Sequence, residues 1–442
     1  MSDAIHRIST IQNNKQFNRL NNSTVKHLNK TSIFAKIFPM EENYQLITKT
    51  AAGLEEVLSD EIKAMGAKNV RIMHRAVICE GNKEMMYRIN YTARTALKVL
   101  KPFKDFRARN EDQLYKEIQK INWCELLRTD QTFAIDAIVS GRCFTHSLYV
   151  AQKTKDAIVD QFRDVYGIRP SVNTLNPDLR ISLHIREDKV KVLFDSSGES
   201  LHKRGYRKMV DKAPMNEVLA AGLIQLSGWK ADCNFVDCMC GSGTIPIEAA
   251  MFAMKIPAGY YRKDYGFMKW DDYDPELWQR IKDEADSQIT DFDHEIWASD
   301  RSGKAIGITE NNLQYAHLTH DIKVMKKNME DLVLPEEKGI VIINPPYGDR
   351  LEEDDIDQVY ENIGNTLKRN FQGWKVWLIT DDAVALKHVG LKPTVKIPLW
   401  NGPLECRFVR FDIFEGRYKD MKAREAEEKE TGNPETDTDK GE

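Results

Sequence analysis

The chain has 442 residues, of which 41% are hydrophobic, and its 64 basic side chains nearly balance 68 acidic ones. At roughly 100–200 residues per domain, this length predicts two to four domains, and the composition excludes wholesale disorder and collagen-like repeats. No apolar run reaches the roughly 18 residues that a membrane helix needs, and no signal-peptide pattern opens the chain. We therefore expect a cytoplasmic protein whose seven cysteines stay reduced.

Charge is unevenly distributed along the chain. Residues 43–210 carry 29 basic and 21 acidic side chains, whereas residues 211–415 carry 23 and 35. A basic front half favours a polyanion-binding module beside another kind of site, although surface charge also drifts between domains without function. Residues 1–42, rich in Asn, Lys and Ser, are predicted to be a disordered basic arm, and residues 418–442 a disordered charged tail.

The front half mixes short strands with helices. Apolar spacing predicts helices at residues 53–65 and 149–166. Alternating or β-branched runs predict strands, at residues 46–48, 76–79, 132–139 and 181–185. This mixture is typical of an α+β fold rather than of a doubly wound sheet.

After about residue 210, strands and helices alternate regularly. Strands are predicted to end near Asp237, Ser299 and Ile343, each followed by a helix or turn signal. Asn401-Gly402 between two apolar runs indicates a hairpin. The order predicts a parallel α/β sheet ending in an antiparallel hairpin, with the Trp- and Tyr-rich residues 255–291 inserted before the second strand.

A first candidate site follows the strand that ends at Asp237. Residues 237–244 read Asp-Cys-Met-Cys-Gly-Ser-Gly-Thr and open a helix, so Gly241 and Gly243 permit a tight turn and close approach of a ligand. Neither a Gly-Lys-Ser/Thr phosphate loop nor a G-x-G-x-x-G fingerprint is present. An acid before the glycines suits a cationic or hydroxyl-bearing ligand, although Gly-Ser-Gly also occurs in ordinary turns.

A second candidate site, Asn344-Pro345-Pro346-Tyr347, follows the apolar strand at residues 340–343. The prolines fix the backbone and leave carbonyls that only accept hydrogen bonds, while Asn344 offers an amide oxygen and Tyr347 a flat ring. Such a corner suits the exocyclic amine of a base that stacks on the ring. A rigid turn is the plainer interpretation, but two such elements at successive strand ends favour a site.

These segments carry a resemblance to a known family. Residues 237–244 resemble motif I of class I S-adenosylmethionine-dependent methyltransferases, and 344–347 resemble the N-P-P-Y motif of amino-methyltransferases. With Leu-His-Lys-Arg-Gly-Tyr-Arg at 201–207 and Ala-Pro at 213–214, the chain is similar over about residues 44–417 to THUMP-containing bacterial rRNA guanine-N2 methyltransferases. The similarity is to the form with one methyltransferase domain, which corresponds to the N-terminal half of the bifunctional 23S rRNA enzyme.

The resemblance implies a domain order. A ferredoxin-like domain is expected at residues 43–105 and a THUMP RNA-binding domain at 106–200. A class I methyltransferase domain with a Rossmann-like, seven-stranded sheet is expected at 201–417.

The resemblance also implies roles for single residues. The expected cofactor-binding residues are Asp237, Cys238, Gly241, Gly243, Thr244, Asp300 and Asp331. Asp237 and the glycines would shape the methionine end of the pocket, Asp300 would bind the ribose hydroxyls, and Asp331 would meet the adenine amino group. The residues expected to hold the target base are Asn344, Pro345, Pro346 and Tyr347. Cys238 stands where the family often has Pro.

Three other features have competing interpretations. Lys203, Arg204, Tyr206 and Arg207 are expected to bind RNA, with a solvated linker as the alternative. The spacing of Cys233, Cys238 and Cys240 does not fit a zinc site, so no metal is expected. The aromatic residues between 260 and 278 are interpreted as core rather than as a stacking surface for RNA.

Together these features predict an enzyme that transfers a methyl group from S-adenosylmethionine to guanine N2 of 23S rRNA. A tRNA guanine-N2 methyltransferase is the nearest alternative. A DNA adenine-N6 methyltransferase, which shares N-P-P-Y, and an inert RNA-binding factor follow. The target base must be single-stranded or flipped, because a stacked amine cannot enter the pocket.

Overall fold

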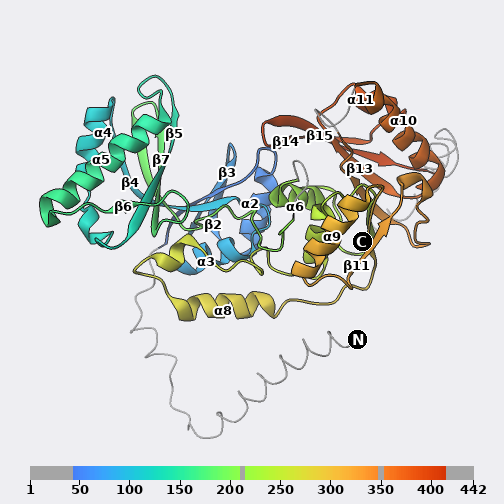
Figure 1. The fold of residues 1–442 in the computed structure, drawn as a ribbon, viewed down its shortest axis with the longest axis horizontal. Coiled ribbons are helices and arrows are strands. Elements are labelled where there is room, and N and C mark those ends of the chain that lie inside the picture. The colour runs from blue at the N-terminus through green and yellow to red at the C-terminus, as the bar shows by residue number, and fades with distance from the viewer. Residues whose placement is uncertain (1–42, 210–214, 347–352, 415–442) are drawn as a thin grey trace, which may run out of the picture. The chain divides into compact units, whose positions relative to one another are not determined.

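Two β-sheets organise the computed structural model, which describes residues 43–209, 215–346 and 353–414 (Figure 1). The predicted arm at 1–42 and tail at 418–442 lie outside the described residues. Within them, no helix is both long and apolar enough to cross a membrane.

The first sheet has eight strands in the order β2-β3-β1-β4-β8-β7-β5-β6. Neighbours run antiparallel, except that β5 pairs in parallel with both β6 and β7. The strands are β1 (Tyr44–Lys49), β2 (Lys68–Met73), β3 (Ala76–Gly81), β4 (Lys98–Arg107), β5 (Thr132–Ser140), β6 (Ser171–Val172), β7 (Leu179–Arg186) and β8 (Lys189–Asp195). The helices are α2 (Glu55–Ala64), α3 (Lys83–Thr92), α4 (Glu111–Gln119), the short η2 (Trp123–Glu125) and α5 (Ser147–Tyr166). The α+β prediction for the front half is confirmed.

Strand β4 joins two modules into this one sheet. It pairs with β1 on one side and β8 on the other, and the domain border expected at residue 105 falls inside it. The sequence pattern missed β4 because Pro102 interrupts it, and the register with β8 does shift between Pro102 and Lys104.

The second sheet has seven strands in the order β11-β10-β9-β12-β13-β15-β14. The first five are parallel and the last two form an antiparallel hairpin in which Asn401 faces Leu404, as predicted. The strands are β9 (Asn234–Asp237), β10 (Ile296–Asp300), β11 (Ile322–Lys326), β12 (Gly339–Ile343), β13 (Lys375–Thr380), β14 (Val395–Asn401) and β15 (Leu404–Asp412). The helices are α6 (Glu217–Leu226), α7 (Thr244–Ala253), α8 (Pro275–Asp286), α9 (Gly303–Tyr315), α10 (Glu353–Asn370), α11 (Ala385–His388) and the short η3 (Gly266–Lys269) and η4 (Met329–Asp331). The Rossmann-like, seven-stranded sheet is confirmed.

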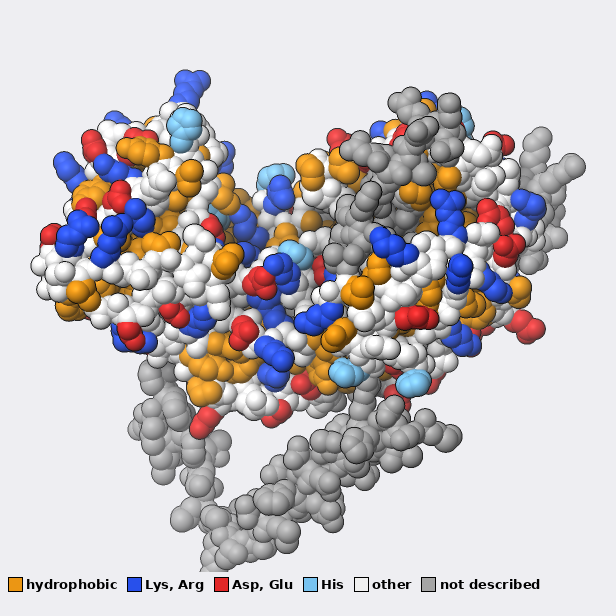
Figure 2. Space-filling view, in the orientation of Figure 1, with side chains coloured by type: hydrophobic (Ala, Val, Ile, Leu, Met, Phe, Trp, Pro, Cys, Tyr) orange, Lys and Arg blue, Asp and Glu red, His pale blue; other side chains and the backbone are white. Residues whose placement is uncertain are grey.

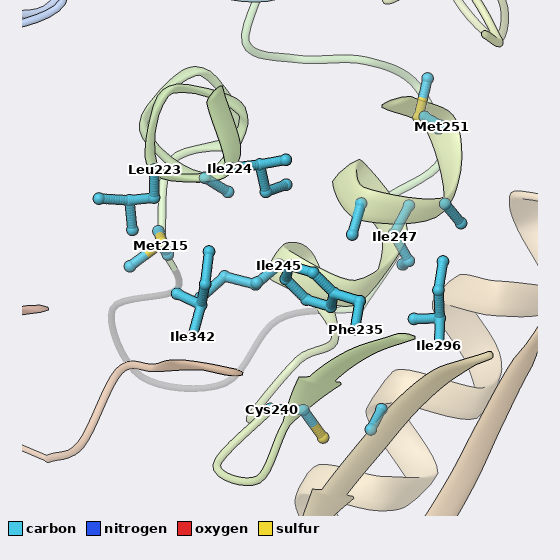
Figure 3. Packing of buried hydrophobic residues seen from close by; sticks show 14 of the residues in the cluster. Met215, Leu223, Ile224, Phe235, Cys240, Ile245, Ile247, Met251, Ile296 and Ile342 are labelled. Atoms are coloured by element: carbon cyan, nitrogen blue, oxygen red, sulfur yellow. The ribbon is translucent and has the colours of Figure 1, made fainter. Parts of the chain in front are cut away.

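Strand β9 is an inner strand of the second sheet and is held in place by buried side chains on its faces. Figure 3 shows Ile245 and Ile247 of α7 near Phe235 of β9, and Leu223 of α6 belongs to the same buried cluster. Burying one such side chain contributes about 1.5–3 kcal/mol. From β9 the strand order proceeds outward in one direction to β10 and β11, and then in the opposite direction to β12 and β13. Open α/β sheets bind ligands where the strand order reverses in this way, beyond the carboxyl ends of the strands.

The aromatic insertion packs as core. Phe267 stacks on Tyr87 of α3 with ring centroids 4.1 Å apart, and Trp278 meets Tyr91 edge-on at 5.4 Å. Phe267 and Trp278 are buried, so the interpretation of these aromatics as core is confirmed for them.

Candidate active site

The glycine loop at residues 238–243 joins β9 to α7. Gly243 has a φ of +79°, and a Cβ there would lie 2.8 Å from the methyl group of Thr309, so no larger residue fits. Gly241 has a φ of +55°, and among the described residues no atom lies within 4 Å of the position its Cβ would take. The loop is therefore packed against α9 at Gly243 and open to an approaching ligand at Gly241.

Asp237, the last residue of β9, is a buried carboxylate with one free oxygen. Its Oδ1 accepts the Met239 N–H at 3.1 Å, whereas its Oδ2 is buried and has no hydrogen-bond partner among the described residues. Burial, reinforced by the Asp300 charge, raises the pKa of Asp237 to about 8. An acid held in this way is suited to a cationic or donor group of a ligand.

Asp300 ends the neighbouring strand β10 and reaches the same loop. Its Oδ2 accepts the Gly241 N–H at 3.0 Å, and its Oδ1 accepts the Ser302 N–H at 2.8 Å. Parallel pairing of Ala298 with Asp237 sets the two strand ends side by side. The two acids expected at successive strand ends thus meet at one loop.

Two residues of α9 hold the glycine loop, and neither was predicted from the sequence. The Thr309 hydroxyl donates to the Gly241 carbonyl at 2.9 Å. The Asn312 amide donates to the Ser242 carbonyl at 3.0 Å, while its oxygen accepts the N–H groups of Lys208 and Met209. No local motif marks them, because their role comes from the packing of α9 on the loop.

Asn344 stands at the end of β12, the strand on the other side of β9. Ile340 and Val341 pair with Phe235 and Val236, so the Asn-Pro-Pro corner and the glycine loop share one edge of the sheet. The Asn344 Oδ1 is buried and has no hydrogen-bond partner among the described residues. Pro345 is buried and Pro346 half-buried, whereas Tyr347 lies outside the described residues.

Asp331 and Cys238 also belong to the expected cofactor-binding set, and Cys240 lies in the same loop as Cys238. Asp331 is exposed at the end of η4, where its Oδ2 accepts from Asn328 at 3.2 Å. Cys238 and Cys240 are buried thiols whose pKa values burial raises well above the usual range, so both are neutral. No group of metal-ligating side chains occurs in the described part of the chain.

The prediction that Arg204 and Tyr206 contact RNA is corrected by their burial. Arg204 has 1% of its surface exposed and Tyr206 has none, and both bond to Glu248 Oε1, at 3.3 and 3.0 Å. The Arg204 guanidinium is buried against the Glu248 carboxylate and cannot reach a phosphate on the surface. Lys203 is exposed, as an RNA contact requires.

Arg207 is directed inward, toward the candidate site. Its Nη2 donates to the Thr244 hydroxyl and to the Met215 carbonyl, both at 2.7 Å. Its Nε lies 3.2 Å from Glu217 Oε1. Burial raises the pKa of Glu217 to about 7 although Arg207 lowers it.

Comparisons with known proteins identify the domains of this chain. Family models match residues 45–100 (RlmL ferredoxin-like domain), 108–195 (THUMP domain) and 204–410 (RMKL-like, methyltransferase domain). A Synechocystis protein provisionally named an RNA methyltransferase is 34% identical over 366 residues, covering 82% of this chain and 95% of its own. The ribosomal RNA large subunit methyltransferase K/L of Syntrophotalea carbinolica is 35% identical over 86% of this chain but only 55% of its own length.

A solved structure shares the whole architecture. It is a provisionally named methyltransferase complexed with SAH, 29% identical, with a TM-score of 0.76 over 86% of this chain and 100% of its own. Fold and site define a class I methyltransferase joined to ferredoxin-like and THUMP domains. The chain belongs to the RMKL-like family of THUMP-containing methyltransferases, and it spans about half the length of the K/L members it matches.

Proposed function

We propose that this protein transfers a methyl group from S-adenosylmethionine to the exocyclic N2 of a guanine in 23S rRNA. The observation that carries the proposal is the buried Asn344 Oδ1, which lacks a partner among the described residues at the strand end beside the glycine loop. A buried acceptor of this kind is costly unless a ligand amine satisfies it.

The site residues fit the cofactor. Asp237 offers a buried, unpaired oxygen, Gly241 an open backbone, and Asp300 a half-buried carboxylate. We assign Asp237 and the loop 238–244 to the methionine end, Asp300 to the ribose hydroxyls, and Asp331 to the adenine amino group. When bound, S-adenosylmethionine supplies an electrophilic methyl group on a positively charged sulfonium.

The chain's own contribution is positioning. The guanine N2 lone pair is delocalised into the ring, so the amine is a weak nucleophile. If Asn344 Oδ1 and the Pro345 carbonyl accept its two N–H bonds, they hold the nitrogen in line for attack and favour a localised lone pair. Tyr347 is assigned to stacking on the base. The amine proton then leaves from the nitrogen to water.

RNA is the proposed substrate for two reasons. A THUMP domain precedes the catalytic domain, and relatives at 35% identity are named for the rRNA of the large subunit. A tRNA guanine is the alternative, because THUMP domains also serve enzymes that act on tRNA.

One experiment tests the substrate and the methylated atom together. The full chain is incubated with radiolabelled cofactor and, separately, with unmodified rRNA, tRNA and DNA, followed by nucleoside analysis. N2-methylguanosine confined to 23S rRNA is the expected result. The same nucleoside in tRNA would select the alternative, methyladenine in DNA would overturn the RNA assignment, and no transfer would leave a binding factor.

A further inference from the structure

A basic groove lies where the THUMP module, the linker after it and the aromatic insertion meet. Its volume is about 540 Å³, and six of its lining residues are basic against three acidic. The basic residues are Arg180, Lys203, Lys208, Arg262, Lys263 and Lys269. Figure 2 shows further Lys and Arg side chains over α4 and α5 of the THUMP module.

Some of these cations hold the walls together. Arg262 donates to five backbone carbonyls, four of them in the linker at Ser197, Glu199, Ser200 and Lys203. Lys269 of the insertion donates to the carbonyls of Asn176 and Pro177. These donors are occupied, so they build the groove and are not available to a ligand.

Three other cations make only weak side-chain contacts among the described residues, and one of these contacts places the Lys208 ammonium 5.9 Å from the centroid of the Tyr315 ring. Lys203, Lys208 and Lys263 are exposed, and no hydrogen bond or ion pair is found for Lys263 among the described residues. Among the described residues Lys203 pairs with the exposed Glu199, an interaction that costs little to exchange for a phosphate. The groove therefore presents three exposed ammonium groups, while Arg262 and Lys269 hold its backbone in place.

Hydrogen bonds connect Lys208, at one end of the groove, to the glycine loop of the candidate active site. The Lys208 N–H bonds to Asn312, whose amide bonds to Ser242 of the glycine loop. At its other end the groove shares Asp178 and Lys269 with a pocket of about 260 Å³ lined by Phe103, Phe194 and Trp270. Phe103 is 40% exposed and stacks on Phe194, with ring centroids 4.6 Å apart.

We infer that this groove and the pocket beside it bind a single-stranded segment of the RNA substrate, with phosphates on Lys203, Lys208 and Lys263 in the groove and a base stacked on Phe103 in the pocket. Cations beside an exposed ring are the usual means of binding single strands. The groove volume is within the range of about 300–1,000 Å³ typical of small-ligand sites, which suits a few nucleotides of a single strand. The inference deepens the proposed function and rests on RNA being the substrate.

The test measures binding of a short fluorescent single-stranded RNA of mixed sequence to the full chain, by anisotropy over a range of salt concentrations. The groove variant combines Lys203→Gln, Lys208→Gln and Lys263→Gln. The control combines Lys230→Gln, Lys387→Gln and Lys392→Gln, which remove the same charge from exposed positions elsewhere. The groove variant should lower the slope of log affinity against log salt by about 0.7 for each phosphate that is no longer neutralised, and the control should not.

Two further measurements sharpen the test. Phe103→Ala should weaken binding roughly 5- to 100-fold with the slope unchanged. Thiouridine in the same RNA should crosslink to peptides from 197–208 and 261–269. The inference would be overturned if the groove variant kept the wild-type salt slope, or if the control variant lost as much slope as the groove variant. It would also be overturned if the wild-type protein did not bind the RNA. Intact binding without methyl transfer would overturn the proposed function alone.

Discussion

The Arg207 guanidinium and the Thr244 hydroxyl meet at 2.7 Å, which ties the segment after the THUMP module to the first residue of α7, directly behind the glycine loop. The same guanidinium binds the Met215 carbonyl and lies 3.2 Å from Glu217. One side chain thus connects the linker, the start of α6 and the loop. We therefore expect Arg207 to hold these three segments in place around the candidate cofactor site.

Thr244→Val tests this connection while keeping the shape of the side chain. It removes the acceptor of one of the two Arg207 Nη2 hydrogen bonds, so we expect the free energy of unfolding to fall by about 1.5–3 kcal/mol, measured by urea denaturation. Thr290→Val, at an exposed position outside the site, is the control and should change it little. Equal effects at the two positions would contradict the role of this hydrogen bond.

Asp237→Asn should stabilise the ligand-free protein, increasingly so with pH. A carboxylate whose folded pKa is raised to about 8 from an ordinary 3.8 costs stability as pH rises through that interval. Asparagine can still accept the Met239 N–H but carries no charge. The free energies of unfolding of the two proteins, measured by denaturation at each pH, should coincide near pH 4 and differ by several kcal/mol toward pH 8. Above pH 8 the difference should stay constant. A constant difference between pH 4 and pH 8 would show that the acid is not held neutral.

The same carboxyl predicts proton release on cofactor binding. A cationic ligand group beside Asp237 favours the carboxylate, so a proton held at neutral pH should be released. Calorimetry in buffers of different ionisation enthalpy should show release of up to one proton near pH 7. Asp237→Asn should abolish the buffer dependence together with most of the affinity.

A feature of this fold can be predicted from the sequence when neighbouring residues determine it, and not when it depends on contacts between distant segments. The parallel sheet, the glycine loop and the Asn-Pro-Pro corner could be predicted because their signals are local. Strand–helix alternation, Gly241 and the two prolines each determine the conformation of the residues next to them in sequence. Thr309 and Asn312 were missed because only the packing of α9 brings them to the loop. Arg204 was misassigned because a basic run is usually solvated, whereas its partner Glu248 lies 44 residues further along the chain.

Asn344→Ala should remove methyl transfer while cofactor binding persists. The amide oxygen is assigned to the target amine and not to the cofactor, so kcat should fall by at least roughly 100- to 1,000-fold, as when one preorganised polar group is removed from an active site. Radiolabel transfer gives the rate and calorimetry the cofactor affinity. Asn362→Ala, at an exposed position of α10, is the matched control. Loss of cofactor affinity in Asn344→Ala would contradict this division of roles.

Arg204 and Lys203 are adjacent in sequence but should behave oppositely. Arg204→Met leaves Glu248 buried without its cation, so we expect a loss of about 3–5 kcal/mol in the free energy of unfolding. Lys203→Met breaks only the exposed pair with Glu199 and should cost no more than about 1 kcal/mol. In salt titrations of RNA binding, carried out where both variants remain folded, only Lys203→Met should reduce the slope, because only that ammonium can reach a phosphate. A reduced slope for Arg204→Met at unchanged stability would mean that the guanidinium leaves Glu248 to bind RNA.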